Sequence, residues 1–256
     1  MMILTMSYEQ YTAFTWGWIG TAVLVFFLLL YVTAPYGRHA KTTWGPSISN
    51  KWGWFIMEFF LLVFLFYFVL TGENEQSTVN WIIIGAISIH YFNRSVIFPL
   101  RIKTKGKKMP FLIVMMALGF NLSNGYLFGY YLGNFRIYSI EWLTTPQFII
   151  GSIIFLCGVI INKYSDTKLI NLRKKGETGY QIPHGGLFNY ISCPNLFGEV
   201  VEWFGFAILT WSLPGLAFFV WTFANLVPRA ISHHKWYLKN FEDYPKDRKA
   251  VIPFIW

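Results

Sequence analysis

Two carboxylates enter a long apolar stretch of this sequence close to one another. Glu199 and Glu202 are three residues apart, so on a helix they lie on nearly the same face, and the run 204–227 that follows contains no charged residue. An ionisable side chain at bilayer depth costs roughly 2.5–3.5 kcal/mol even on the lenient insertion scale. Two of them on one helical face, beside Asn195, predict a polar cavity inside a membrane protein. The alternative is that both lie hydrated at the lipid headgroups, with a structural role.

A second group of polar side chains interrupts two other apolar stretches. Glu58 is the one charged residue in 52–70, and His90, Tyr91 and Arg94 have the spacing that makes side chains neighbours on a helix. A carboxyl group that keeps its proton in an apolar cavity donates a hydrogen bond, and so does a tyrosine hydroxyl. Two such donors converging on one carbonyl oxygen form an electrophilic site, which is the chemistry we expect of Glu58 and Tyr91. For Tyr91 alone, an ordinary packed aromatic ring is the alternative.

A third group combines cations, amides and tyrosines beside the apolar stretches. Its members are Asn162, Asp166, Arg173, Lys174, Lys175, Tyr180, Arg229, His233 and Tyr237. Arginine offers a planar fork for phosphate, so the set suits an anionic nucleotide, although basic residues beside a membrane also bind lipid headgroups. No GxGxxG or Walker-type motif occurs, so a nucleotide would be held by neither a Rossmann unit nor a P-loop. The adjacent His233 and His234 point different ways on a helix, and no HExxH motif occurs, so we predict no metal site.

The composition indicates a membrane protein. Hydrophobic residues make up 55% of the 256 residues and charged ones only 13%, and the mean hydropathy is +0.42. A soluble domain is about a quarter charged. The net charge of +9 comes from cations clustered between the apolar segments. This distribution indicates which loops lie on the cytoplasmic side of a membrane, and it does not indicate that the protein binds nucleic acid. Cys157 and Cys193 fall in an apolar run and a basic loop, so we expect no disulfide framework.

The apolar segments predict seven transmembrane helices. Five of them are 14–32, 52–70, 79–100, 110–132 and a shorter run, 148–161, that follows Pro146; the sixth and seventh share 195–227 and are separated at 212–214. The basic loop before Asn195 and the basic tail after Val227 both belong in the cytoplasm, which requires two crossings between them. Nineteen of the 21 lysines and arginines then lie on one side. We therefore predict an all-α membrane protein with its N-terminus outside and its C-terminus in the cytoplasm.

The C-terminal third closely resembles the steroid 5-alpha-reductase family. The matching stretches are NKYSD at 162–166, YQIPHGGLF at 180–188, NLFGEVVEW at 195–203 and the tail HHKWYLKNFEDYPKDRKAVIPFIW at 233–256. A weaker N-terminal match comprises YGR at 36–38, Glu58 and HYFNR at 90–94. The resemblance covers nearly the whole chain and is most specific in the tail. The chain is similar to bacterial-type members, which implies a bacterial inner membrane.

The resemblance implies a membrane reductase that binds NADPH from the cytoplasmic side and reduces the enone of a Δ4-3-keto steroid or a similar lipid. Hydride goes to the β-carbon, C5, while Glu58 and Tyr91 hold the 3-keto oxygen. The residues carried over as cofactor contacts are Asn162, Asp166, Arg173, Tyr180, Asn195, Glu199, Arg229, His233 and Tyr237, with Arg38 and Arg94, and with Glu202 and Trp203 at the nicotinamide end. We expect one monomeric domain over 1–256, with the substrate side in 1–133 and the NADPH side in 146–256.

Two departures from the family pattern bear on specificity. Steroid-specific members usually carry glutamine before the glutamate that corresponds to Glu58, where this chain has Met57. The family also commonly has arginine after the tyrosine that corresponds to Tyr180, where this chain has Gln181. Related reductases of enoyl-thioesters or polyprenols are therefore an alternative. An isoprenylcysteine-type methyltransferase using S-adenosylmethionine is more remote, because Glu58 with Tyr91 favours the reductase. A transporter would show internal repeats or paired broken helices, and neither is evident.

Overall fold

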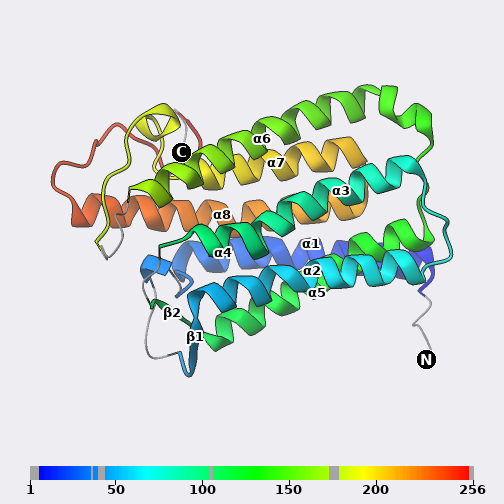
Figure 1. The fold of residues 1–256 in the computed structure, drawn as a ribbon, viewed down its shortest axis with the longest axis horizontal. Helices are drawn as coiled ribbons and strands as arrows, with labels where there is room; N and C mark the ends of the chain where they lie inside the picture. The colour runs from blue at the N-terminus through cyan, green and yellow to red at the C-terminus, as the bar shows by residue number, and fades with distance from the viewer. Residues whose placement is uncertain (1–5, 36, 40–43, 104–105, 173–178, 254–256) are drawn as a thin grey trace.

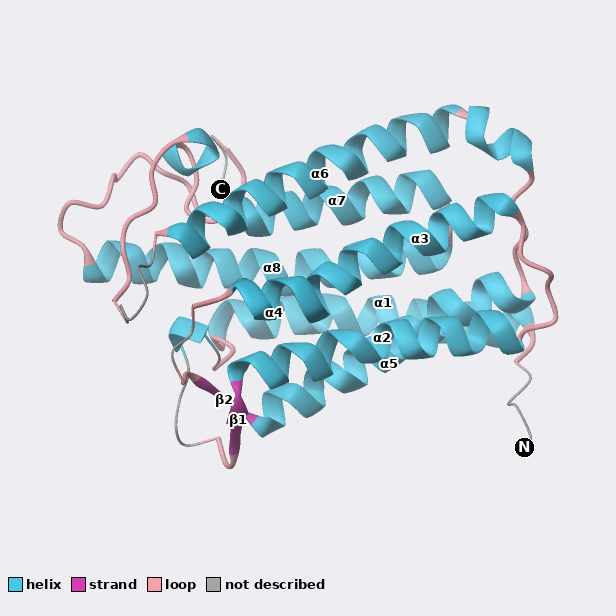
Figure 2. Ribbon diagram, viewed as in Figure 1, coloured by secondary structure: helices cyan, strands magenta, loops and turns pink. Residues whose placement is uncertain are grey.

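The chain folds into a bundle of long helices that lie side by side (Figure 1). The computed structural model describes residues 6–35, 37–39, 44–103, 106–172 and 179–253. The α-helices are α1 Tyr8–Tyr31, α2 Asn50–Thr71, α3 Thr78–Phe92, α4 Phe98–Arg101, α5 Phe111–Asn134, α6 Pro146–Asn171, α7 Pro194–Thr210 and α8 Leu213–Asn240. The shorter elements are β1 Ser47–Ser49, β2 Lys108–Pro110, a π-helical turn Asn93–Ile97 and 3-10 turns at Gly37–His39, Ile140–Thr144 and Gly186–Asn189. Figure 2 shows how few strands accompany the helices in the described residues.

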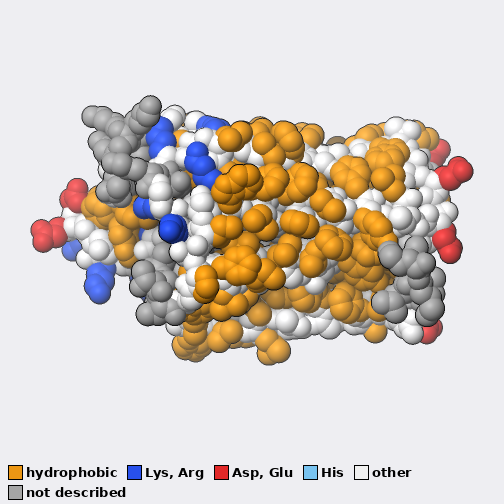
Figure 3. Space-filling model, turned by 60° about the horizontal axis from the view of Figure 1, so that its bottom comes forward, with side chains coloured by type: hydrophobic (Ala, Val, Ile, Leu, Met, Phe, Trp, Pro, Cys, Tyr) orange, Lys and Arg blue, Asp and Glu red, His pale blue; other side chains and the backbone are white. Residues whose placement is uncertain are grey.

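Six of the described helices are long and apolar enough to cross a membrane. They are α1, α2, α5, α6, α8 and the continuous segment from Thr78 to Arg101. Apolar side chains cover the middle of the bundle, and lysines and arginines gather at one end of that cover on the face drawn in Figure 3. The predicted class, an all-α membrane protein, is therefore confirmed. Helix α7, with 17 residues, runs beside α6 in the same bundle.

Local sequence sets several of the helix ends. Ser7 opens α1 with a reciprocal capping box to Gln10, and Ser77 opens α3 by accepting a hydrogen bond from the Asn80 backbone. The break between α7 and α8 lies at 211–212 and overlaps the predicted break at 212–214. Trp211 takes a left-handed conformation, with φ of 42°, and the Ser212 side chain caps α8. The tail was expected to follow Val227, but α8 continues to Asn240, with Pro228 inside it.

The third predicted span is not a uniform α-helix. Helix α3 passes through the π-helical turn 93–97 before α4 begins, and the Phe98 amide donates to the Asn93 carbonyl five residues back. Pro99 has no amide hydrogen to donate to the preceding turn, which accounts for irregular hydrogen bonding at this point. The turn carries Arg94, one of the predicted cofactor residues. Sequence periodicity alone cannot show such a local change, because the π-helical turn adds one residue to a helical turn without changing the apolar pattern.

Glycines allow the helices to pack closely in pairs. The most extensive packing is between α6 and α7, followed by α2 with α5, and then α1 and α7 against α8. A Cβ atom on Gly129 of α5 would lie 2.7 Å from the Leu65 carbonyl oxygen of α2, and one on Gly158 of α6 would collide with the backbone of Glu202 on α7. In lipid, where apolar side chains gain little from leaving solvent, such close backbone contact is a main source of helix association. It fixes the depth of Glu202 relative to α6.

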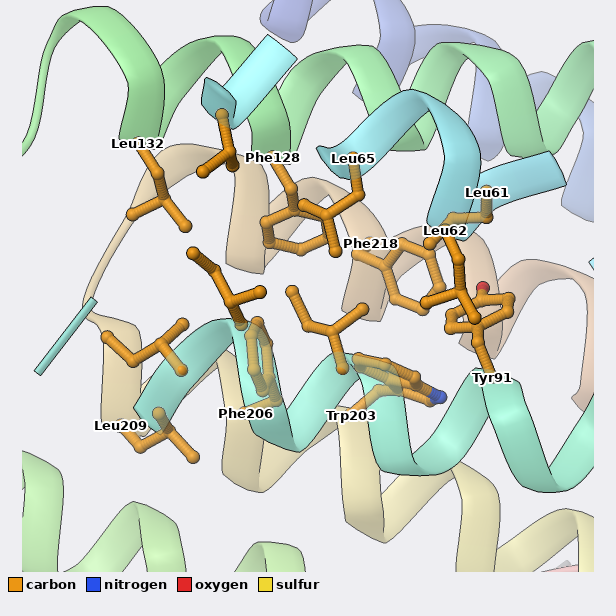
Figure 4. Close-up of a cluster of buried hydrophobic side chains, with 14 of the residues drawn as sticks. Leu61, Leu62, Leu65, Tyr91, Phe128, Leu132, Trp203, Phe206, Leu209 and Phe218 are labelled. Atoms are coloured by element: carbon orange, nitrogen blue, oxygen red, sulfur yellow. The ribbon is translucent and has the colours of Figure 1, made fainter. Parts of the chain in front are cut away.

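The core lies where α2, α3, α5, α7 and α8 meet. Figure 4 shows Tyr91 of α3 extending toward the leucines of α2, with Trp203 of α7 and Phe218 of α8 beside it. The labelled members of this cluster are Leu61, Leu62, Leu65, Tyr91, Phe128, Leu132, Trp203, Phe206, Leu209 and Phe218. One predicted catalytic side chain thus belongs to the apolar core itself.

Loops and strands close the end of the bundle where the cations gather. β1 and β2 form an antiparallel pair that joins the α1–α2 connection to the α4–α5 connection. The C-terminal tail returns to the segment before α7, where the Ser192 amide donates to the Lys249 carbonyl over 2.8 Å and Arg248 donates to the Pro183 carbonyl over 3.0 Å. Ser192 also hydrogen-bonds the Tyr244 hydroxyl, and burial raises the pKa of that tyrosine. The tail is therefore part of the fold around the predicted cofactor residues.

Candidate active site

Glu58 and Tyr91 approach one another from α2 and α3. Leu61 and Leu62, three and four residues after Glu58, pack with Tyr91 in the core, so Glu58 is one turn closer to the end where β1 lies. Helix α2 packs against α3 and against the π-helical turn that follows Tyr91. That hydroxyl makes no hydrogen bond to any described residue, although Tyr91 is 4% exposed. A donor with no protein acceptor is available to a ligand.

Asn121 of α5 supports Glu58, and the sequence analysis missed it. Its side-chain amide donates to the Met57 carbonyl over 2.5 Å and lies 3.5 Å from the nearer Glu58 carboxylate oxygen. The Asn121 Oδ1 atom is buried without a partner. An amide inside the apolar run 110–132 was a usable signal, because a polar group at bilayer depth needs a partner.

Glu202 and Trp203 occupy the next layer of the site, on α7. The Glu202 carboxylate accepts a hydrogen bond from His90 Nδ1 over 2.7 Å, and both side chains are buried. The Trp203 ring lies 6.1 Å from the Tyr91 ring and 4.3 Å from the Phe218 ring. Trp203 therefore packs beside Tyr91 and Phe218 in the core, and Glu202 is directed toward α3.

Five of the predicted cofactor residues form one polar network, which lies nearer than Glu202 to the cation-rich end of the bundle. Arg94 lies 3.3 Å from Asp166 and 3.6 Å from Glu199, and its guanidinium stacks 5.0 Å above the Trp54 ring. Asn195 donates to Asp166 over 3.1 Å. A further donor, Asn162, bonds the Asn195 carbonyl over 2.9 Å and lies 3.4 Å from Glu199. One cation faces two carboxylates, so the network has acceptors available for hydroxyl or amide hydrogens.

A second group of predicted residues surrounds Arg38. Its guanidinium lies 5.0 Å from the Tyr180 ring, 4.9 Å from the Trp236 ring and 4.5 Å from the Tyr237 ring, and it donates to the Tyr237 hydroxyl over 3.3 Å. The other terminal nitrogen, Nη1, is buried and has no hydrogen-bond partner within the described residues. A buried N–H of a cation is costly to leave without an acceptor, so this atom is placed to donate to an anionic ligand. Trp236 was not predicted.

A cavity of about 200 Å³ connects the Arg38 group to the polar network. Its lining includes Arg38, Lys103, Asp166, Tyr180, Gln181, Asn195 and Tyr237. Ligand clefts usually measure about 300–1,000 Å³, so a dinucleotide would also occupy space outside this cavity. Its lining combines two cations of connecting segments, Arg38 and Lys103, with the Asp166 carboxylate of α6 and the Asn195 amide of α7, and this combination suits a phosphate-bearing nucleotide.

Arg229 and His233 lie together on α8, beside the connection that follows α1. Arg229 donates to the Ala34 carbonyl over 2.7 Å, and His233 Nδ1 lies 3.1 Å from Nε2 of His39, whose ring stacks on it. Burial, assisted by the charges of Arg229 and Arg38, lowers the pKa of His39 to about 4. His39 is thus neutral at neutral pH. It follows Arg38 directly in the sequence, which was the available signal, but the analysis did not select it.

The structure gathers the predicted residues, with one exception. Arg173 lies outside the described residues. Two side chains beside the predicted set were missed, the buried Arg248 and the exposed His184; they lie 3.3 Å apart in the segment where the tail returns. Within the described residues no cluster of metal-ligating side chains is found.

Comparison with known proteins identifies the family. The family model described as 3-oxo-5-alpha-steroid 4-dehydrogenase matches residues 107–256. The chain belongs to this family. It is 45% identical over 233 residues to steroid 5-alpha-reductase DET2 of Gossypium hirsutum, covering 89% of this chain and 90% of that protein. It is 44% identical over 237 residues to 3-oxo-5-alpha-steroid 4-dehydrogenase 1 of Bos taurus, covering 91% and 92%, and 42% identical over 222 residues to the human protein of the same name, covering 86% and 85%.

Membership of the steroid 5-alpha-reductase family makes this chain an oxidoreductase and confirms the resemblance predicted from the tail and the polar motifs. The matched region, 107–256, contains α5 to α8 and therefore Asn121, the α6–α7 network and the α8 residues. The relatives extend the likeness to about nine-tenths of the chain, which includes α2 and α3 with Glu58 and Tyr91.

Proposed function

We propose that this member of the family reduces the C4–C5 double bond of a Δ4-3-keto steroid, or of a similar lipid enone, with NADPH. The observation that carries the proposal is the proximity of Glu58 and Tyr91 on the packed helices α2 and α3, with a Tyr91 hydroxyl that makes no hydrogen bond within the described residues. The printed names of the relatives support a 3-oxo steroid as substrate. The membrane-embedded location suits a ligand that dissolves in lipid.

Glu58 and Tyr91 polarise the enone by hydrogen bonding to its ketone oxygen. Electron density moves from the double bond toward that oxygen, which leaves the β-carbon electron-poor. Because the two donors lie in an environment that excludes water, they stabilise the developing enolate more strongly than water would. Asn121 holds the Glu58 carboxyl and the α2 backbone in place during this step.

The residues at the cation-rich end fit an NADPH molecule. The fit is carried by the orphaned Arg38 nitrogen, which needs an anionic acceptor, and by the acceptor-rich α6–α7 network, which needs hydroxyl or amide donors. Arg38, Tyr180, Arg229, His233, Tyr237 and Arg173 would hold the phosphate-bearing part; Arg94, Asn162, Asp166, Asn195 and Glu199 would hold ribose and amide groups. When bound, the cofactor supplies the hydride that the β-carbon accepts. Trp203 would border its nicotinamide end, whereas the Glu202 carboxylate, which accepts from His90, would face α3 and lie outside that contact.

The reduction adds one hydrogen to each carbon of the double bond. The β-carbon receives the hydride and the α-carbon receives a proton, so the substrate gains two hydrogens and the cofactor is oxidised. Trp203, Phe218 and the α2 leucines enclose the space beside Tyr91 and keep bulk water from the enolate. A flat, apolar ring system fits between such aromatic walls.

We further propose seven crossings, with α7 as one of them, the N-terminus outside and the cofactor residues facing the cytoplasm. A 17-residue helix spans about 26 Å at 1.5 Å per residue, close to the thickness of the hydrocarbon core. The cations at one end of the bundle favour this orientation. Residues 1–133 then form the substrate side and 146–256 the NADPH side of one monomer. Reporter fusions after Asn74 and after Asn240 test the orientation, and the same compartment for both would contradict it.

Turnover by the purified full chain in detergent tests the function. We expect oxidation of NADPH that depends on a Δ4-3-keto steroid, with a product two hydrogens heavier by mass spectrometry. An α,β-unsaturated thioester and a polyprenol serve as competing substrates, because Met57 stands where steroid-specific members carry glutamine. Turnover of either of these with no turnover of any ketosteroid would overturn the proposed substrate class, and no turnover of any enone would overturn the reaction.

A further inference from the structure

His90 and Glu202 form a buried polar pair for which the proposed reaction has no chemical step. The two side chains are 7% and 2% exposed, and His90 Nδ1 and Glu202 Oε1 are 2.7 Å apart. The carboxylate accepts the imidazole N–H, since an ionised carboxylate has no hydrogen to donate. Within the described part of the chain, this is the one side-chain hydrogen bond between α3, Thr78–Phe92, and α7.

Each member of the pair directly precedes an aromatic side chain of the candidate site. His90 precedes Tyr91, and Glu202 precedes Trp203. The His90 ring also contacts both aromatic rings, at 5.2 Å from Tyr91 and 4.9 Å from Trp203. A movement of either member therefore moves the side chains that enclose the substrate space.

Helix α3 packs into the core on one side and borders a second cavity on the other. A cavity of about 100 Å³ separates it from α6 and is lined by His90 and Glu202 together with Ala86, Ile89, Asn93, Phe155, Leu156, Val159, Asn162 and Lys163. Glu202, in contrast, is fixed, because Gly158 brings the α6 backbone against it. The hydrogen bond thus links α3 to the closely packed α6–α7 pair.

We propose that His90 and Glu202 are positioning residues that set the place of Tyr91 relative to Trp203, a role that rests on the proposed reduction at this site. Low polarity strengthens a satisfied hydrogen bond and penalises a broken one, so the pair favours one arrangement of α3. The pair acts on turnover through Tyr91, and neither member touches the reacting atoms.

Two substitutions of Glu202 separate positioning from other roles. Glu202→Gln keeps an oxygen that accepts the imidazole N–H, and we expect its kcat to remain within about threefold of the unaltered protein. Glu202→Leu leaves His90 without a partner, and we expect its kcat to fall by about 30-fold or more, because a misplaced catalytic group lowers the rate steeply. The dissociation constant for NADPH should stay within about twofold in both variants. Tyr138→Phe is the matched control, since it removes another buried hydrogen bond to α7, to the Thr210 carbonyl over 2.6 Å; its kcat should not change.

Fluorine NMR reports on the environment of the Tyr91 side chain and does not depend on measuring enzyme activity. With 3-fluorotyrosine incorporated at position 91 of the full chain in detergent micelles, the fluorine NMR spectrum should show one resonance in the unaltered, Glu202→Gln and Tyr138→Phe proteins. Glu202→Leu should shift or split it. If Glu202→Leu leaves both kcat and the resonance unchanged, the positioning role is overturned while the proposed reaction stands.

Two other outcomes are equally decisive. If Glu202→Leu weakens NADPH binding as much as it lowers kcat, Glu202 is a cofactor contact and the inference fails. If the unaltered chain reduces no enone, the proposed reaction fails, and the fluorine resonance alone then decides whether the pair positions Tyr91.

Discussion

The two ends of the bundle are constructed differently. At the end near the α2–α3 connection, polar groups satisfy one another: Asn80 donates to Gln76 and to the Arg136 carbonyl, and its own oxygen accepts from the Tyr138 amide. Trp142 donates to the Leu209 carbonyl over 2.9 Å. At the cation-rich end, Arg38 keeps a buried nitrogen without a partner beside a cavity. Within the described residues the first end leaves the buried Thr12 hydroxyl without a partner, whereas the second leaves a buried cationic donor that a ligand can use.

This difference shows how a membrane protein combines stability with binding. Close helix contacts through glycines hold α2 against α5 and α6 against α7, so that the polar end does not need to be fully satisfied to remain folded. Two arginines show the contrast. Arg38 and Arg136 both stack on aromatic rings, but only Arg38 borders the cavity. The predictions below use such matched pairs.

The largest expected effect is on turnover. Glu58→Gln should lower kcat by about 100-fold or more, because the amide is a weaker donor to the developing enolate, and should leave the NADPH dissociation constant within about twofold. Steady-state oxidation of NADPH with a ketosteroid gives kcat, and a fluorescence titration gives the binding constant. Glu73→Gln, an exposed carboxyl at the opposite end of the same helix region, is the control. Unchanged turnover in Glu58→Gln would remove Glu58 from the site.

The next effect is on cofactor affinity. Arg38→Lys keeps the positive charge but loses the planar fork and the stacking on three rings, so the NADPH dissociation constant should rise by about tenfold. Arg136→Lys makes the same chemical change on an arginine stacked against Tyr138 and Trp142 at the other end, and should leave the constant unaltered. Equal effects of the two substitutions would show that stability, and not ligand binding, explains the role of Arg38.

A smaller effect tests the glycine contacts. Gly129→Val should lower stability by about 1–3 kcal/mol, because its Cβ would approach the Leu65 carbonyl oxygen to 2.7 Å and force α2 and α5 apart. Gly119→Val, on the same helix with nothing within 4 Å, is the matched control and should change stability little. Thermal unfolding in detergent measures both. A melting temperature equally lowered in the two variants would indicate that β-branching, and not close packing, is responsible.

The smallest effect is a pH dependence at the cation-rich end. The pKa of His39 is about 4 in the folded chain and near 6.5 in the unfolded chain. Between these two pH values the unfolded state binds a proton at His39 and the folded state does not. The stability contribution is therefore complete above about pH 6.5 and decreases as the pH falls toward 4. Between about pH 7 and pH 5, His39→Asn should lose less thermal stability than the unaltered chain. Because the side chain is only half-buried, solvent screening keeps the difference small. Parallel losses in both proteins would assign the pH dependence to other groups.

Much of the fold could be predicted because it depends on local composition. Apolar runs, the Pro146 start and the Ser212 break mark the helices, since a membrane helix must bury its backbone within a long apolar segment. The π-helical turn at 93–97 and the extension of α8 to Asn240 could not be predicted. The first depends on hydrogen-bond geometry, and the second on packing of a polar, mixed sequence against the returning tail.

The sequence by itself determined that this chain is a membrane-embedded oxidoreductase of its family, because hydropathy, the distribution of cations and the tail motif are each properties of a linear pattern. Only the tertiary structure decided which polar residues meet. Asn121 joins Glu58 across α5 and α2, His90 joins Glu202 across α3 and α7, and Arg38 lies among three aromatic rings. These partners are far apart in the sequence, and their contacts depend on the angle and depth at which the helices pack, which glycine contacts such as Gly158 against Glu202 establish.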